Sequence, residues 1–266
     1  MPGNRSNSSG DQPTMKIALE ATGKIGSRAA RVLLAERSVE AIGLIGRRST
    51  SGDPRVSTIT DLAGWDVVAS DDIEHIKRRY RQASDHGIPL VVPTNQAVVT
   101  PNPDIPFVVG ANPRFGLAAS LAAHECTRHE SPMEAVVAWT EPGRPLRRGL
   151  PLVFPQPIGN LWAESGDDVW PQAPPGTQFL AAPVEGPWTG LAVRVTAATP
   201  EGVEVRTLGV ADDSYFLGGI AFAAAVLAAG TGAYPVGVNY PTAAFGTYLE
   251  RALKAGLEIA TFHELR

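Results

Sequence analysis

Glu20, Gly23 and Gly26 stand three residues apart in the segment LEATGKIG. This spacing is typical of the glycine turn that joins a strand to a helix in dinucleotide-binding folds. In such turns the second glycine lets the backbone approach a pyrophosphate, and the third lets the helix pack against the strand. N–H groups at a helix start favour an anion. The predicted pyrophosphate-binding residues are Gly23, Lys24, Ile25 and Gly26.

Glu20 occupies the position where such a turn usually has its first glycine. A glutamate is bulkier and less free in conformation, and we expect its carboxylate to point toward the pyrophosphate position and repel phosphate. Two interpretations follow. Either the turn is an altered dinucleotide site, or the fold serves another reaction in which Glu20 is a working acid or base.

The second predicted strand ends in GRRST, where an NAD-binding site usually has an acidic residue for the ribose hydroxyls. Guanidinium and hydroxyl groups suit a 2′-phosphate instead. We therefore predict NADP as cofactor, with its 2′-phosphate bound by Arg47, Arg48 and Ser49. The alternative is that both arginines face solvent.

Other side chains are candidates for substrate binding and proton transfer. Arg114 follows a predicted central strand, at the sheet edge where open parallel sheets bind ligands. Arg144 belongs to the arginine-rich loop EPGRPLRRG, which suits a carboxylate or phosphate, although a solvated loop is an equal alternative. The catalytic group is not identified by sequence, and Glu20, His124 and Tyr215 are the candidates. No spacing of His, Asp or Glu resembles a metal site, so we predict no metal.

Short, continuous apolar runs predict the elements that position these residues. Strands are expected at 16–21, 39–46, 65–70, 89–94 and 106–112, with helices between them. Uninterrupted valine-rich runs are typical of strands covered on both faces, which predicts a parallel sheet with helices on either side.

The second half changes to longer alternating strands, including a hairpin that turns at residues 200–202, then a buried helix at 213–229. We predict an α/β chain: a Rossmann-type domain followed by an α+β, mixed-sheet domain for substrate and oligomerisation. The expected boundaries are a leader at 1–14, a dinucleotide-type domain at 15–130, the mixed-sheet domain at 131–238, and a helix and strand at 239–266 that return to the first domain.

Residues 16–124 resemble the first domain of dihydrodipicolinate reductases and, more loosely, of saccharopine-dehydrogenase-like oxidoreductases. The segments ATGKIGSRAARVL, HGIPLVVPTN and FVVGANPRFGLAASLAAH carry the resemblance. It implies an NAD(P)-binding Rossmann fold whose nicotinamide lies near Thr94 and Asn112, with Asn95 on the substrate side. The histidine pair and lysine of those reductases are not reproduced, because HECTRHESP contains no lysine, so their substrate chemistry is not carried over.

Composition narrows the function classes. With 23 Lys and Arg against 27 Asp and Glu, the net charge of -4 argues against binding nucleic acid. A single cysteine, Cys126, fits a cytoplasmic protein, and no membrane segment is expected. The first expected function is that of an NADP-dependent reductase or dehydrogenase that acts on a small carbonyl or imine substrate in biosynthesis. We expect the protein to form a homodimer or homotetramer. The alternative is a repurposed Rossmann fold without redox use of a dinucleotide.

Overall fold

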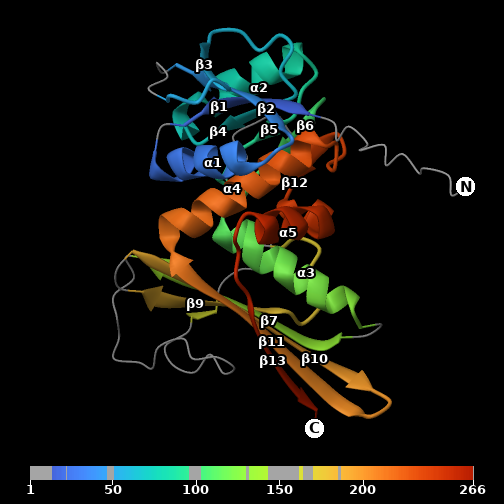
Figure 1. Ribbon diagram of the computed structural model, residues 1–266. Coiled ribbons are helices and arrows are strands. Elements are labelled where there is room, and N and C mark those ends of the chain that lie inside the picture. The colour runs from blue at the N-terminus through green and yellow to red at the C-terminus, as the bar shows by residue number, and fades with distance from the viewer. Residues whose placement is uncertain are drawn as a thin grey trace, which may run out of the picture.

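The computed structural model describes residues 14–21, 23–46, 51–95, 103–129, 132–142, 162–163, 170–184 and 187–265. Two β-sheets stand one above the other, and helices α3, α4 and α5 lie between them (Figure 1). The described elements therefore form a parallel-sheet layer and a mixed-sheet layer joined by helices. This confirms the predicted fold class.

The first sheet is parallel and has the strand order β12-β6-β5-β4-β1-β2-β3. Its strands are β1 (Met15–Glu20), β2 (Val39–Ile45), β3 (Val56–Ile59), β4 (Val67–Ser70), β5 (Leu90–Val91), β6 (Pro106–Val108) and β12 (Gly237–Asn239). Five of them lie in the predicted apolar runs. The other two, β3 and β12, were not predicted, because β3 is short and half-exposed and β12 is only three residues long.

Helices cover both faces of this sheet. Helices α1 (Lys24–Ala35) and α4 (Ser214–Gly230) pack together on one face, where Gly218 and Gly219 lie so close to α1 that a Cβ would contact Ile25 and Arg28. The short helix η1 (Ile73–His75) leads into α2 (Ile76–Asp85), which covers the other face. Among the described residues, no helix combines the length and apolarity needed to cross a membrane.

The second sheet has the order β13-β11-β10-β7-β9-β8 and is mixed, because β7 and β9 run parallel. Its strands are β7 (Pro132–Pro142), β8 (Trp162–Ala163), β9 (Gln178–Val184), β10 (Trp188–Thr199), β11 (Gly202–Asp213) and β13 (Ala260–Leu265). The predicted hairpin is confirmed, since β10 and β11 pair along their whole length from Trp188↔Asp213 to Thr199↔Gly202.

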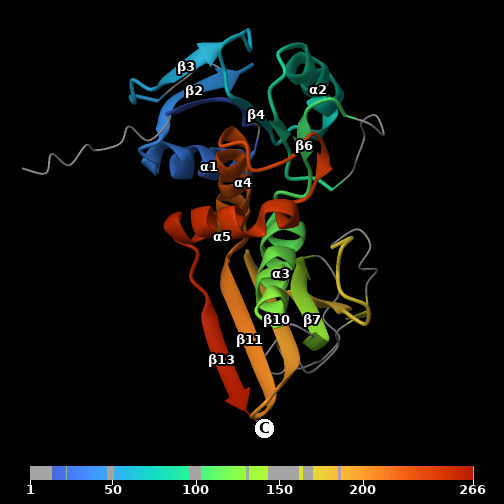
Figure 2. The same ribbon diagram turned by 90° about the vertical axis from the view of Figure 1, so that its right-hand side faces the viewer.

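Helical segments connect the two sheets. A π-helical turn, η2 (Pro113–Ala118), continues into α3 (Ala119–Thr127), and η3 (Pro241–Ala244) continues into α5 (Phe245–Lys254). Figure 2 shows α3 lying along the second sheet, with α5 above it. A partly buried ion pair fixes α3 to that sheet, because Arg206 Nε of β11 donates to the buried Glu125 Oε2 at 2.7 Å.

The end of the chain differs from the expected organisation. The expectation that the last strand returns to the first domain is wrong, because β13 pairs antiparallel with β11 in the second sheet. There it covers an edge of β11 that would otherwise present unpaired backbone groups. In contrast, β12 and α4, which lie within the expected second domain or at its boundary, complete the first sheet.

Candidate functional site

The carboxyl ends of parallel strands meet at one edge of the first sheet. The turn after β1 and the segments after β4, β5 and β6 all leave the sheet there. Open parallel sheets bind their ligands at this edge. Gly23 is the N-cap residue of α1, so the predicted glycine turn opens a helix as expected.

The glycine turn holds an anion supplied by the protein itself. Asp71, the first residue after β4, accepts hydrogen bonds at Oδ2 from the backbone N–H groups of Gly23 and Gly26, both at 3.1 Å. A Cβ on Gly26 would lie 2.4 Å from the same oxygen and 2.8 Å from the Cβ of Ala21. Glycine is therefore required at position 26 by both the carboxylate and the backbone beside it.

Glu20 points away from this turn. Its Oε2 accepts from Arg79 Nε at 2.9 Å and from Ser70 Oγ at 2.7 Å, and its Oε1 accepts from Arg79 Nη2 at 2.5 Å. Both partners are buried, with 3% of Glu20 and 3% of Arg79 exposed. The expectation that this carboxylate faces the pyrophosphate position is wrong, because a buried guanidinium from α2 binds both of its oxygens.

The surroundings of Glu20 keep it ionised. Burial raises the pKa of the Glu20 carboxyl, but the hydrogen bonds from Arg79 and Ser70 and the charges of Arg79 and His75 outweigh burial, and the net pKa lies below its ordinary value. An ionised carboxylate held by a guanidinium does not suit proton donation near neutral pH. Glu20 therefore serves the structure of this sheet edge.

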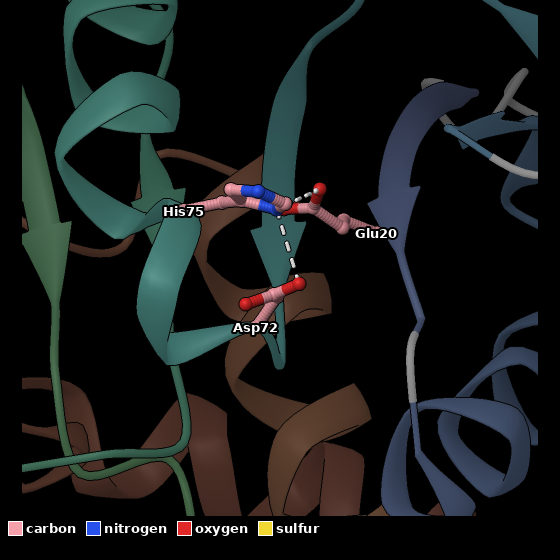
Figure 3. A group of neighbouring side chains, drawn as sticks. All are labelled: Glu20, Asp72 and His75. Carbon is pink, nitrogen blue, oxygen red and sulfur yellow. Dashed lines mark hydrogen bonds and ion pairs between the residues drawn. The ribbon is translucent and has the colours of Figure 1, made fainter.

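His75 contacts two carboxylates beside the turn, and dashed lines lead from its ring to Glu20 and to Asp72 in Figure 3. Its Nδ1 is 3.0 Å from Asp72 Oδ2 and 3.3 Å from Glu20 Oε1. Because ionised carboxylates only accept, Nδ1 carries the hydrogen. These three groups have ligand atoms close enough to surround a cation. However, Arg79 already compensates the charge of Glu20, so the geometry favours an ion-pair network.

A cavity of about 780 Å³ opens where α1 and α4 begin. It is lined by Gly23, Lys24, Ser27, Arg28, Arg31, Asp212, Asp213, Tyr215 and Phe216. Lys24 Nζ lies 4.5 Å from the ring centroid of Tyr215, and Arg28 Cζ lies 4.5 Å from that of Phe216. The cavity thus places three basic side chains and two aspartates beside the glycine turn, in a volume typical of small-molecule sites.

One aspartate of this cavity, Asp213, also caps a helix. Asp213 Oδ1 accepts from the N–H groups of Tyr215 and Phe216, both at 3.0 Å, and so caps α4. Asp213 is therefore the N-cap residue of α4. Tyr215 itself is 41% exposed and lies within the cavity.

Hydrogen bonds join the segments that follow β5 and β6. Asn112 accepts from Phe115 N at 3.0 Å and donates through Nδ2 to the carbonyl of Pro93 at 2.7 Å. Gly110 N donates to the carbonyl of Thr94 at 2.7 Å. The side chain of Asn112 therefore holds the loop that carries Thr94 and Asn95, and the ligand roles of these three residues stay predictions.

Arg114 and His124 lie in different surroundings. Arg114 Cζ stacks 4.1 Å from the ring centroid of Trp139 on β7, so this arginine connects the edge of the first sheet with the second sheet. His124 is exposed on α3, with its ring 6.3 Å from that of Phe245 on α5. Unlike Tyr215, it does not line the cavity. Arg47, Arg48, Ser49 and Arg144 lie outside the described residues.

Two residues of the site were missed from sequence: Asp71 as a ligand of the turn, and Arg79. A signal for Arg79 existed, because it shares the helical face of Ile76 and Ala83, both of which are buried. For Asp71 the sequence offers only its place at a strand end, where helix capping is the commoner role.

Comparison with known proteins identifies the fold. No family model matches the chain, and no curated protein matches it. Among solved structures, a mutant meso-DAP dehydrogenase with DAP from Clostridium tetani E88 matches with 10% identity and a TM-score of 0.56, covering 89% of this chain and 96% of that one. An engineered D-amino acid dehydrogenase bound to NADP+ matches with 11% identity and a TM-score of 0.50, covering 86% and 93%.

The chain has the fold of these dehydrogenases. A dihydrodipicolinate reductase with bound dipicolinate, from Paenisporosarcina sp. TG-14, also matches, with 12% identity and a TM-score of 0.46, covering 86% of this chain and 98% of that one. The two dehydrogenase structures confirm the predicted Rossmann-type fold, and at such identities the likeness concerns the fold alone.

Proposed function

We propose that this protein is an NADP-dependent oxidoreductase that acts on a small carbonyl or imine substrate. The observation that carries the proposal is the glycine turn, whose N–H groups at Gly23 and Gly26 converge on a single anionic oxygen at 3.1 Å each. A turn with this geometry, at the carboxyl edge of a parallel sheet, suits a pyrophosphate. The dehydrogenase fold and the basic side chains Lys24, Arg28 and Arg31 of the cavity beside the turn support the same conclusion.

The residues present fit such a cofactor. Bound NADP would supply the hydride chemistry, while the protein supplies binding, orientation and electrostatics. In this proposal the turn amides and Lys24 bind the pyrophosphate, and Arg47 and Arg48 bind the 2′-phosphate. Thr94 and Asn112 line the nicotinamide side.

The substrate side and the proton donor follow from the same placement. In this proposal Arg114, whose guanidinium stacks on Trp139, orients an anionic group of the substrate. Asn95 and Arg144 are the other proposed substrate residues, and Arg144 is proposed from the sequence alone. Among the acid–base candidates, Tyr215 is the one that lines the cavity, and it is our proposed proton donor.

We expect NADPH to bind more tightly than NADH, and the double substitution Arg47→Ala, Arg48→Ala to remove that preference. Hydrogen bonds to charged groups contribute about 1.5–3 kcal/mol each, so the loss in NADPH affinity is at least about tenfold. Titration calorimetry or cofactor fluorescence measures both affinities. Arg78→Ala, a charge change on the exposed side of α2, is the matched control and leaves the affinities unchanged. Equal affinity for NADH and NADPH would contradict the assignment to NADP.

A second function is favoured by one specific observation. The turn amides already bind Asp71, and a buried ion pair stands in place of the first glycine. A non-redox enzyme, or a binding protein without catalysis, would retain the fold with the turn closed in this way. Absence of NADPH binding at millimolar concentration would establish this alternative over the oxidoreductase.

We also propose a homo-oligomer that forms through the second sheet. Strand β13 is an outer strand of that sheet and exposes Phe262 to 42%. An exposed strand edge favours pairing with another chain. Light scattering at micromolar concentration is expected to give a multiple of the chain mass of 28.0 kDa. A mass of 28.0 kDa in solution would contradict the proposal.

A further inference from the structure

Three consecutive residues at the end of β4 bind the region of the glycine turn. Ser70 donates to Glu20, Asp71 accepts from the turn amides, and Asp72 caps η1 by accepting from Glu74 N at 3.0 Å. The backbone of Asp71 is also fixed, because its N–H donates to the carbonyl of Glu20 at 3.1 Å. The backbone of this segment is therefore held in place, and any displacement of the Asp71 carboxylate requires rotation of that side chain.

The carboxylate of Asp71 binds the two amides that the proposed function assigns to a pyrophosphate. Asp71 Oδ2 accepts from the N–H groups of both Gly23 and Gly26. The same oxygen would lie 2.4 Å from an ideal Cβ on Gly26, so it lies directly against the side of this glycine that has no side chain. That face is the surface through which a glycine turn lets phosphate approach the backbone. Two anions cannot share these two donors, and their charges repel at this distance.

We propose that Asp71 is an internal ligand of the turn that competes with the cofactor pyrophosphate and thereby determines dinucleotide affinity. The proposal rests on the proposed function. In the free protein the carboxylate satisfies the two amides at the start of α1, which otherwise have no partner within the helix. Dinucleotide binding then requires the Asp71 side chain to rotate out, while Lys24 stays at the turn to meet the incoming phosphate.

The test compares Asp71→Asn and Asp71→Ala with the unmodified full-length protein. Each is titrated with NADPH and, separately, with inorganic pyrophosphate, by calorimetry. We expect both variants to bind both ligands roughly tenfold to a hundredfold more tightly, because both substitutions remove the competing charge and Asp71→Ala also removes the two hydrogen bonds. Asp85→Asn is the matched control. It removes the same charge at the far end of α2, where it is exposed, and leaves both affinities unchanged.

The outcomes separate this proposal from the proposed function. NADPH binding by the unmodified protein, with equal or weaker binding by both variants, overturns the competition and leaves the oxidoreductase standing. Stronger pyrophosphate binding by the variants, with no NADPH binding by any form, supports the competition and overturns the oxidoreductase. No binding of either ligand by any form overturns both. Asp71→Asn keeps the shape of the side chain, so it remains informative if Asp71→Ala does not fold.

Discussion

Replacing Glu20 with glycine, the residue usual at this position of a dinucleotide turn, is expected to lower the free energy of unfolding by about 3–5 kcal/mol. The substitution leaves the buried guanidinium of Arg79 without its carboxylate, and removing one partner of a buried ion pair typically has a cost of this size. Chemical denaturation monitored by circular dichroism measures the change. A glycine here therefore does not simply restore a dinucleotide site, because Glu20 is bonded to α2 and not directed at the turn.

A double-mutant cycle tests the reason for this loss. Glu20→Leu alone leaves the guanidinium of Arg79 uncompensated, and Arg79→Met alone leaves the Glu20 carboxylate uncompensated. Each is expected to be comparably destabilising. The pair Glu20→Leu, Arg79→Met removes both charges and is expected to recover a large part of the stability. Additive effects of the two single substitutions would show that the ion pair does not couple these residues.

The same ion pair predicts how stability depends on pH. The pKa of Glu20 is lower in the folded protein than its ordinary value near 4.5. Its contribution to stability is therefore complete above that ordinary value and is lost as the pH falls through the lowered folded-state pKa. Denaturation measured from pH 7 to pH 3 is expected to show a smaller acid loss in Glu20→Gln than in the unmodified protein.

Replacing Trp139 with alanine is the second change with a large expected effect, about 3–5 kcal/mol of unfolding free energy. The side chain is only 1% exposed and belongs to the core shared by β7, β10 and the connecting helices. Its ring also supports Arg114, whose guanidinium lies 4.1 Å from the ring centroid. The substitution therefore removes core volume and the surface that positions a proposed substrate residue.

Trp188→Ala is the matched control, since that tryptophan begins β10 and is 41% exposed. We expect it to change the unfolding free energy by less than about 1 kcal/mol. Trp139→Phe retains an aromatic face for Arg114 and is expected to be milder than Trp139→Ala. Equal losses for Trp139→Ala and Trp188→Ala would contradict the placement of Trp139 in the core.

The strands of the first sheet were predictable where burial on both faces makes their residues uniformly apolar. Strand β4 is the clearest case, since all four residues from Val67 to Ser70 are buried. Strand β3 was not predictable, because Val56 and Ile59 enclose two exposed polar residues in a segment too short to show a period. The pairing of β13 with β11 could not be predicted from the sequence either, because it depends on which strand edges remain unpaired after the other elements have packed.

The glycine turn could be predicted from the sequence, but the direction of the Glu20 side chain could not. Gly23 and Gly26 follow from local spacing, since a turn needs its glycines at fixed separations. The direction of Glu20 depends on Arg79, which is 59 residues away and lies on a different element. The residues next to Glu20 in the sequence do not indicate such a contact. The same is true of Asp71, which meets Gly26 only because β4 lies beside β1.

Helix α4 has a consequence for the order in which the chain acquires its structure during synthesis. The ribosome releases β1 to β6 first. However, α4 covers part of the sheet face that carries Ile17 and Leu19, and α4 is synthesised only after the long hairpin of β10 and β11. Until residues 214–230 emerge, that apolar face stays open to water. The two sheets are thus completed almost together, and a nascent chain stopped after β6 is expected to depend on chaperones.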